Sequence, residues 1–291
     1  MEVIDLAWWK LGLAALLVLA LAATGYVARL GITRNLLIAA LRTVIQLALI
    51  GLVLEALFAS AAFYWIALMA LVMLLVAGRE VVARQGRRLH GWWAFGIGTG
   101  AMFVSSFAVT VLALTVVIGP EPWYTPQYAI PLLGMMLGNT MTGISLALDR
   151  LNEGAWRQRA VIENRLMLGQ TWQQAFEDIR REAMRSGMMP SINAMAAAGI
   201  VSLPGMMTGQ ILAGSPPAVA VKYQILVMLI ITVGTGFGAV MAVSWGSRRL
   251  FDEREPLPGQ VMIAASQRSC RAPGWSRCGP LYRQPQQPEW T

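Results

Sequence analysis

Apolar residues along this chain gather in long continuous runs, which short polar segments separate. A membrane-spanning helix needs about 20 predominantly apolar residues, because each residue adds about 1.5 Å to its length. Runs that are long enough lie at residues 6–28, 36–58, 61–78, 93–118, 128–148, 189–213 and 219–245. The pattern therefore predicts an all-α, polytopic membrane protein with about seven transmembrane helices.

Basic residues lie in alternate loops between these runs and indicate an orientation. Arginines follow the first, third, fifth and seventh runs, whereas the loops around Ser60, Glu121 and Ser215 contain neither Lys nor Arg. Because cytoplasmic loops carry an excess of Lys and Arg, we expect the amino terminus outside and the carboxyl terminus in the cytoplasm. The predicted organisation is a transmembrane domain at 1–250, with a cytoplasmic helical loop at 149–188, and a disordered cytoplasmic tail at 251–291.

Composition excludes several classes of function. Hydrophobic residues make up 56% of the chain and charged residues 13%, which predicts a protein of the plasma (cell inner) membrane. In so apolar a chain, we do not interpret the net charge of +8 as a sign of nucleic-acid binding. No Walker A motif occurs, so the chain has no ATP site of its own. One histidine, His90, and two cysteines, Cys270 and Cys278, are too few for a four-ligand zinc site. We expect no catalytic residue and no cofactor.

Two segments, 134–143 and 205–214, share the pattern Gly-Met-Met-x-Gly-Asn/Gln-x-x-x-Gly. Glycines four residues apart let two helix backbones approach closely, and an amide, Asn139 or Gln210, follows each pair. Because the segments lie in consecutive runs of opposite direction, they either line a transport pathway as antiparallel repeats or pack a helix bundle.

The same two segments carry soft donors and a helix breaker. Their methionines are Met135, Met136, Met206 and Met207. Thioethers in these positions either bind a soft cation such as Cu(I) or fill gaps between helices. Pro204, directly before Gly205, predicts a broken helix with free backbone carbonyls, a feature that recurs at transport sites.

A few polar side chains lie inside the other apolar runs. Arg42 lies in the second run with Gln46 one turn later on the same helix face. An ionisable group there indicates either a pathway, a buried ion pair, or a side chain that extends to the membrane surface. Asn193 and Gln224 are further polar candidates in the last two runs.

The polar segment 149–188 carries a helical pattern of its own. Apolar residues recur at Trp172, Phe176, Ile179 and Ala183, which is the period of an amphipathic helix. Thr171 and Gln174 fit a capping box at its start, and Gly169 predicts a break from an earlier helix at 151–168. Such a helix–turn–helix either receives a soluble partner or lies on the membrane surface.

Four segments resemble one family of transport proteins. They are Arg42-x-x-x-Gln46-Leu47, residues 131–148, residues 163–169 and residues 201–214, of which the last is the most specific. With them the chain, over 6–250, resembles the FetB-type ABC transporter permease family, whose bacterial members are implicated in iron export and whose plant members are linked to aluminium tolerance. The resemblance implies a permease subunit that exports iron or a related metal, acts with a separate ATP-binding subunit, and forms a permease homodimer.

The resemblance also implies roles for particular residues. The loop that faces the ATPase would comprise Glu163, Leu168, Gly169, Gln170 and Trp172. The translocation pathway, or the helix packing beside it, would involve Arg42, Gln46, Met135, Met136, Asn139, Pro204, Gly205, Met206, Met207 and Gln210. No metal ligand is assigned, since iron favours carboxylate or imidazole and the runs contain almost none.

Two other functions remain open at the level of sequence. One is a self-sufficient secondary metal transporter coupled to an ion gradient, although the scarcity of carboxylates inside the runs argues against proton coupling. The other is a scaffold or sensor that transports nothing and whose basic loops bind anionic lipid.

Overall fold

The computed structural model describes residues 8–29, 31, 33–60, 62–89, 92–251 and 262–264. Residues 1–7, His90 and most of the predicted tail, with Cys270 and Cys278, lie outside this described part. The elements are α1 (Trp8–Val27), α2 (Thr33–Ser60), α3 (Phe63–Arg84), β1 (Arg87–Leu89), α4 (Trp93–Met102), η1 (Phe103–Phe107), α5 (Ala108–Leu112), η2 (Ala113–Ile118), α6 (Pro126–Arg157), α7 (Arg159–Met167), α8 (Trp172–Ala175), α9 (Glu177–Ala197), α10 (Gly205–Leu212), α11 (Pro217–Leu250) and β2 (Met262–Ala264). The predicted all-α class is confirmed, apart from the two three-residue strands.

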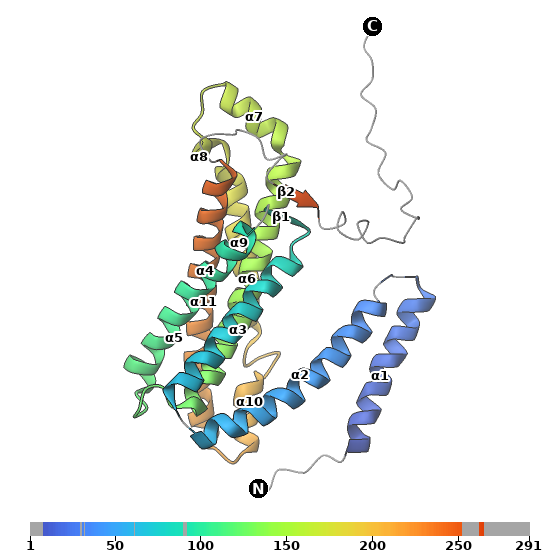
Figure 1. The fold of residues 1–291 in the computed structure, drawn as a ribbon, viewed down its shortest axis with the longest axis vertical. Helices are drawn as coiled ribbons and strands as arrows, with labels where there is room; N and C mark the ends of the chain where they lie inside the picture. Colours follow the sequence, from blue (N-terminus) through green and yellow to red (C-terminus); the bar gives the residue numbers. More distant parts are fainter. Residues whose placement is uncertain are drawn as a thin grey trace.

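Within the described residues, six of the predicted runs form continuous helical segments that are long and apolar enough to cross a membrane. They are α1, α2, α3, the segment from α4 to η2, α6 and α11. The prediction of about seven transmembrane helices is corrected at the sixth run, 189–213, which is not one continuous helix in the described chain. α9 and α10 follow one another beside α11 instead, with irregular backbone between them (Figure 1).

Backbone chemistry explains the break between α9 and α10. Gly199 adopts a φ of +82°, which is open to glycine at little cost, and Pro204 has no N–H to donate to a preceding turn. The N–H groups of Val201 and Ser202 both reach back to the carbonyl of Ala197. This confirms the break predicted before Gly205.

The bundle core is formed by α3, α4, α6, α9 and α11, whose buried residues make one continuous cluster. α6 and α9 cross most closely where two glycines face each other: a Cβ on Gly187 would lie 2.8 Å from the carbonyl oxygen of Gly143. The glycines four residues apart in segments 134–143 and 205–214, which were predicted to let helices approach closely, behave differently. A Cβ on Gly138 or Gly209 would meet nothing within 4 Å, so these glycines do not mediate a close helix crossing in the described chain.

The α1–α2 hairpin stands apart from this bundle (Figure 1). Its apolar side chains are largely exposed, as in Leu17 at 74% and Leu52 at 67%, which suits helices that face lipid. Arg42 on α2 pairs with Glu80 on α3, with 2.6 Å between Nη2 and Oε1. The Arg42 side chain is 52% exposed, so the pair is not a buried one.

Beyond the predicted membrane segment, α6 continues to Arg157 and a short connection leads to α7, α8 and α9. We call α7, the turn at 168–171 and α8 the elbow, and the end of the bundle that carries it the elbow end (Figure 1). The predicted capping box is confirmed, since Thr171 accepts from the Gln174 N–H and the Gln174 side chain accepts from the Thr171 N–H. The predicted helix at 151–168 is corrected, because it is divided at Gln158.

The predicted amphipathic stripe is buried against the bundle. Phe176, Ile179 and Ala183 are at most 3% exposed, and a Cβ on Gly154 of α6 would touch Ile179 at 2.8 Å. The stripe thus packs on α6 and does not face a membrane surface. At the same end, β2 pairs antiparallel with β1, so three residues of the predicted tail are ordered against the loop between α3 and α4.

Candidate functional site

A cleft of about 180 Å³ lies where the broken helix meets α6 and α11. It is lined by Met135, Asn139, Ser191, Ala194, Pro204, Gly205, Met206, Gln224, Val227, Met228, Ile231 and Thr232. These residues come from α6, α9, the start of α10 and α11. The cleft exists because α9 stops at Ala197 and α10 begins at Gly205, which leaves space that a continuous helix would fill.

The polar groups of the cleft are neutral. Gln224 is 8% exposed, and its Oε1 has no hydrogen-bond partner in the described chain. The Asn139 amide nitrogen donates to the carbonyl of Met135 at 2.8 Å, and Thr232 Oγ1 donates to the Met228 carbonyl at 2.9 Å. Thioethers of three methionines complete the set. None of the described residues that line the cleft is charged, so their side chains offer amide, hydroxyl and thioether groups as ligands.

The structure brings together about half of the residues predicted for the pathway. The cleft contains Met135, Asn139, Pro204, Gly205 and Met206. Met136, Met207, Gln210, Arg42 and Gln46 do not line it. Met136 is fully buried beside Gly234 of α11, and Arg42 and Gln46 lie on the separate helix α2.

Sequence reasoning did not identify Ser191 and Thr232 as members of this site. A hydroxyl side chain in an apolar helix usually bonds to its own backbone, as Thr232 does, so it leaves no distinct signal in the sequence. Gln224 was visible as a polar residue in an apolar run, but nothing in the sequence placed it in the same cleft as Asn139.

The elbow exposes apolar side chains outside the helices that form the core. Met167 is 78% exposed and Leu168 83% exposed, and we call these two residues the elbow tip. Gly169 follows with a φ of +83°, which turns the chain sharply after α7. Glu163 pairs with Arg159 of the same helix at 2.7 Å, and Gln170 is exposed. Of the residues predicted to face a partner, Leu168, Gly169 and Gln170 lie in the turn at 168–171, whereas Glu163 lies within α7 and Trp172 begins α8.

Three aromatic rings connect the elbow to the end of α11. Trp172 stacks on Phe251 with 5.7 Å between ring centroids and 24° between planes, and Phe176 meets Phe251 edge-on at 5.0 Å. Phe251 directly follows α11, which supplies five residues of the cleft. We call these rings the aromatic link, because they join the elbow to the helix that lines the cleft.

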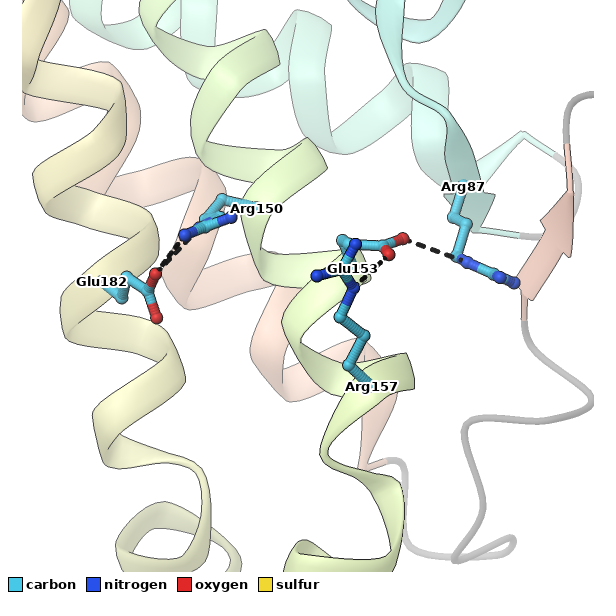
Figure 2. Close-up of polar contacts among 5 residues, drawn as sticks. All are labelled: Arg87, Arg150, Glu153, Arg157 and Glu182. Carbon is cyan, nitrogen blue, oxygen red and sulfur yellow. Dashed lines mark hydrogen bonds and ion pairs between the residues drawn. The ribbon is translucent and has the colours of Figure 1, made fainter.

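Charged side chains hold the elbow end together, as Figure 2 shows. Arg150 of α6 bonds to Glu182 of α9 through two nitrogens, at 2.9 and 2.5 Å. Glu153 of α6 accepts from Arg157 one turn later and from Arg87 of β1, at 2.7 and 3.2 Å. These pairs tie α6 to α9 on one side and to the loop between α3 and α4 on the other.

The same loop is fixed further by polar contacts along α6. The Gly86 N–H donates to Asp149 Oδ1 at 2.8 Å, and the buried Asn152 donates to the Arg87 carbonyl at 3.1 Å. The Arg87 guanidinium lies 4.3 Å from the ring centre of Trp156. These contacts fix the loop between α3 and α4 against the last turns of α6.

The fold and these features define a multi-pass membrane protein of the permease type. Residues 8–251 match the model of the uncharacterised protein family UPF0014, and the chain belongs to this family. It is 36% identical over 262 residues to the UPF0014 membrane protein slr1647 of Synechocystis, covering 87% of this chain and 97% of the relative. No solved structure matches the chain.

Other relatives are named for metals. The chain is 29% identical over 254 residues to the probable iron export permease protein FetB of Escherichia coli, covering 85% of this chain and 93% of the relative. It is 32% identical over 216 residues to the protein ALUMINUM SENSITIVE 3 of Arabidopsis thaliana, covering 74% and 77%. The predicted resemblance to the FetB-type family is thereby confirmed, and an inner-membrane location is consistent with the bacterial relatives.

Proposed function

We propose that this chain is the membrane permease subunit of an ABC-type transporter, which exports iron or a related metal together with a separate ATPase subunit. The observation that carries the proposal is the exposed apolar elbow tip, joined through the aromatic link to the helix that lines the cleft. A large apolar side chain that protrudes from a polar loop gains free energy when a partner covers it. The chain contains no Walker A motif, so the partner would supply ATP hydrolysis.

The contacts at the elbow support a mechanical route from the partner to the cleft. Arg165 of α7 donates to the Ala175 carbonyl at 3.3 Å and to Asp178 at 3.0 Å, so α7, α8 and α9 move together. Through Phe251, the same movement reaches α11, and α11 carries Gln224 and Thr232 into the cleft. A shift of α11 against α6 changes the size of the cleft, which is the step that alternating access requires.

The lining of the cleft supports a cargo of low charge. Neutral oxygens and thioethers do not compensate several positive charges, and an uncompensated charge within a membrane is expensive. The cargo would therefore be a metal ion of low charge, or a metal that keeps part of its own ligand shell. Two chains would be needed to present two elbows to a pair of ATPase subunits, which agrees with a permease homodimer.

The test is affinity purification of the chain from its native membranes, with the amount of co-purified ATPase measured for three versions. The wild type and Leu168→Met, which keeps the apolar surface, are expected to retain a Walker-type ATPase in near-equal amount. Leu168→Asp is expected to lose most of it, because burial of a charge on an apolar partner surface is costly. ATP-dependent iron transport in vesicles should fall in parallel.

Two results would contradict this proposal. Equal recovery of the ATPase with Leu168→Asp would remove the elbow tip from the interface. Iron transport by the chain alone, in vesicles without ATP, would replace an ABC permease with a secondary transporter coupled to an ion gradient.

A further inference from the structure

A second hollow lies at the elbow end, between the start of α4 and the end of α11. It is a groove of about 590 Å³, lined by Trp93, Gly96, Ile97, Trp245, Arg248 and Arg249. On each helix the other two lining residues lie three and four positions after the tryptophan, so each helix presents one face to the groove. The groove is separate from the cleft, with which it shares no lining residue.

Small residues on α4 create the groove. A Cβ on Gly96 would meet nothing within 4 Å, so the space above it is open. One turn later, Trp245 of α11 lies over Gly100, where a Cβ would be 3.2 Å from the indole ring. The indole thus forms one wall of the groove, and Trp93, which is 55% exposed, forms another.

Among the described residues, the groove is lined by two guanidinium groups and by no acidic side chain. The Arg249 guanidinium lies 4.5 Å from the ring centre of Trp93, which orients it at the rim. Arg248 is exposed and forms no ion pair with any acid of the described chain. A guanidinium group can donate two parallel N–H bonds to the oxygens of one phosphate. The two arginines of the groove therefore suit a phosphate group.

The position of the groove indicates the molecule that carries this phosphate. The apolar segment from α4 to η2 begins here and that of α11 ends here, so the groove lies at the boundary of the membrane-spanning region. Tryptophans at such a boundary sit at the level of the lipid headgroups. Beside the arginines, Ile97 and the two indoles provide an apolar wall. A soluble phosphate would leave this wall uncovered, whereas the glycerol and acyl chains of a lipid would cover it.

We propose that this groove is a binding site for an anionic phospholipid. The phosphate group would be held by Arg248 and Arg249, and the upper part of the acyl chains would lie along Trp93 and Trp245. Basic pockets between membrane helices bind anionic headgroups in this way. The site is independent of the metal cargo and of any ATPase, and it lies beside the segment where α11 meets the aromatic link.

The experiment compares lipid retention by variants of the full chain in nanodiscs made of equal parts phosphatidylglycerol and phosphatidylcholine. Lipids that remain bound after transfer to mild detergent are counted by native mass spectrometry. The wild type is expected to retain phosphatidylglycerol in preference to phosphatidylcholine. Arg248→Gln is expected to reduce that preference about fivefold, and loss of both arginines to reduce it further.

A second variant tests the groove without changing charge. Gly96→Leu places a side chain in open space, so it should occlude the groove and abolish retention while the melting temperature stays near that of the wild type. The matched control is the double variant Arg79→Gln and Arg84→Gln, which removes two exposed arginines from α3 at the same end of the bundle. It should retain phosphatidylglycerol as the wild type does.

The results that would overturn the proposal are specific. Unchanged preference for phosphatidylglycerol in both Arg248→Gln and Gly96→Leu would show that the groove is not the site. Loss of preference in the α3 control to the same degree would show that overall charge is sufficient. Release of the bound lipid by millimolar inorganic phosphate or glycerol phosphate would assign the groove to a soluble anion instead.

Discussion

Replacement of Gly187 by alanine tests the close approach of α9 to α6. The new Cβ would lie 2.8 Å from the carbonyl oxygen of Gly143 and 2.8 Å from Ala147 Cβ, both on α6. Non-bonded carbon atoms are comfortable at about 3.5–4.0 Å, so α6 and α9 would have to separate. Overpacking costs about 1–3 kcal/mol, and the upper part of that range, about 2–3 kcal/mol, applies here because one of the atoms met is a backbone oxygen.

Alanine also favours the helix over glycine by about 1 kcal/mol, which offsets part of that cost. The net loss should be about 1–2 kcal/mol, and a loss of 1 kcal/mol lowers the melting temperature of a chain of this size by about 2–4 °C. We therefore expect the melting temperature of Gly187→Ala in detergent to fall by about 2–8 °C. Intrinsic tryptophan fluorescence during heating measures the transition.

Gly138→Ala provides the matched control on α6. Its Cβ would meet nothing within 4 Å, so only the gain in helix propensity remains and the melting temperature should stay level or rise. The reasoning would be refuted if Gly187→Ala melted at or above the wild-type temperature while Gly138→Ala lost stability. That outcome would favour the glycine pair that sequence analysis had selected for close packing.

Three further predictions concern the cleft, the elbow end and the aromatic link. Gln224→Leu removes a buried amide whose oxygen has no hydrogen-bond partner in the described chain, so the free energy of unfolding should hold or rise by about 1 kcal/mol. The metal-stimulated ATPase activity of the purified complex should fall. Arg150→Ala and Glu182→Ala break a pair that is about half exposed, so a double-mutant cycle in thermal melts should give a coupling of only about 0.2–1 kcal/mol. Phe251→Ala loses two ring contacts worth about 1–3 kcal/mol together, and should leave the ATPase bound but uncouple ATP hydrolysis from transport in vesicles.

The candidate site was accessible to sequence reasoning only in part. Pro204 and Gly205 predicted a broken helix because proline lacks an N–H, a local property that holds in any surroundings. The two Gly-Met-Met segments predicted that methionines lie at the pathway. They did not show that Met135 and Met206 line the cleft whereas Met136 and Met207 do not. Which methionine of each pair faces the cleft depends on how the helices rotate against their neighbours, and that is a long-range property.

Features that depend on neighbours along the chain could be predicted from the amino-acid sequence. Apart from the run at 189–213, the apolar runs indicate the candidate membrane helices, because the length of a helix follows from its residue count. The capping box at Thr171 and the turn at Gly169 follow from hydrogen bonds and backbone angles within a few residues. These terms are short-ranged, so no knowledge of the fold was needed.

Contacts between residues far apart in the sequence became known from the fold alone. It placed Gly143 against Gly187, joined Trp172 to Phe251, and brought Gln224 opposite the break between α9 and α10. In each case the two segments lie far apart in the sequence, and every apolar helix of the bundle could in principle pack against several others. The shape of the side chains at each crossing selects one arrangement, which is why the cleft and the link to the elbow emerge from the fold and not from any single segment.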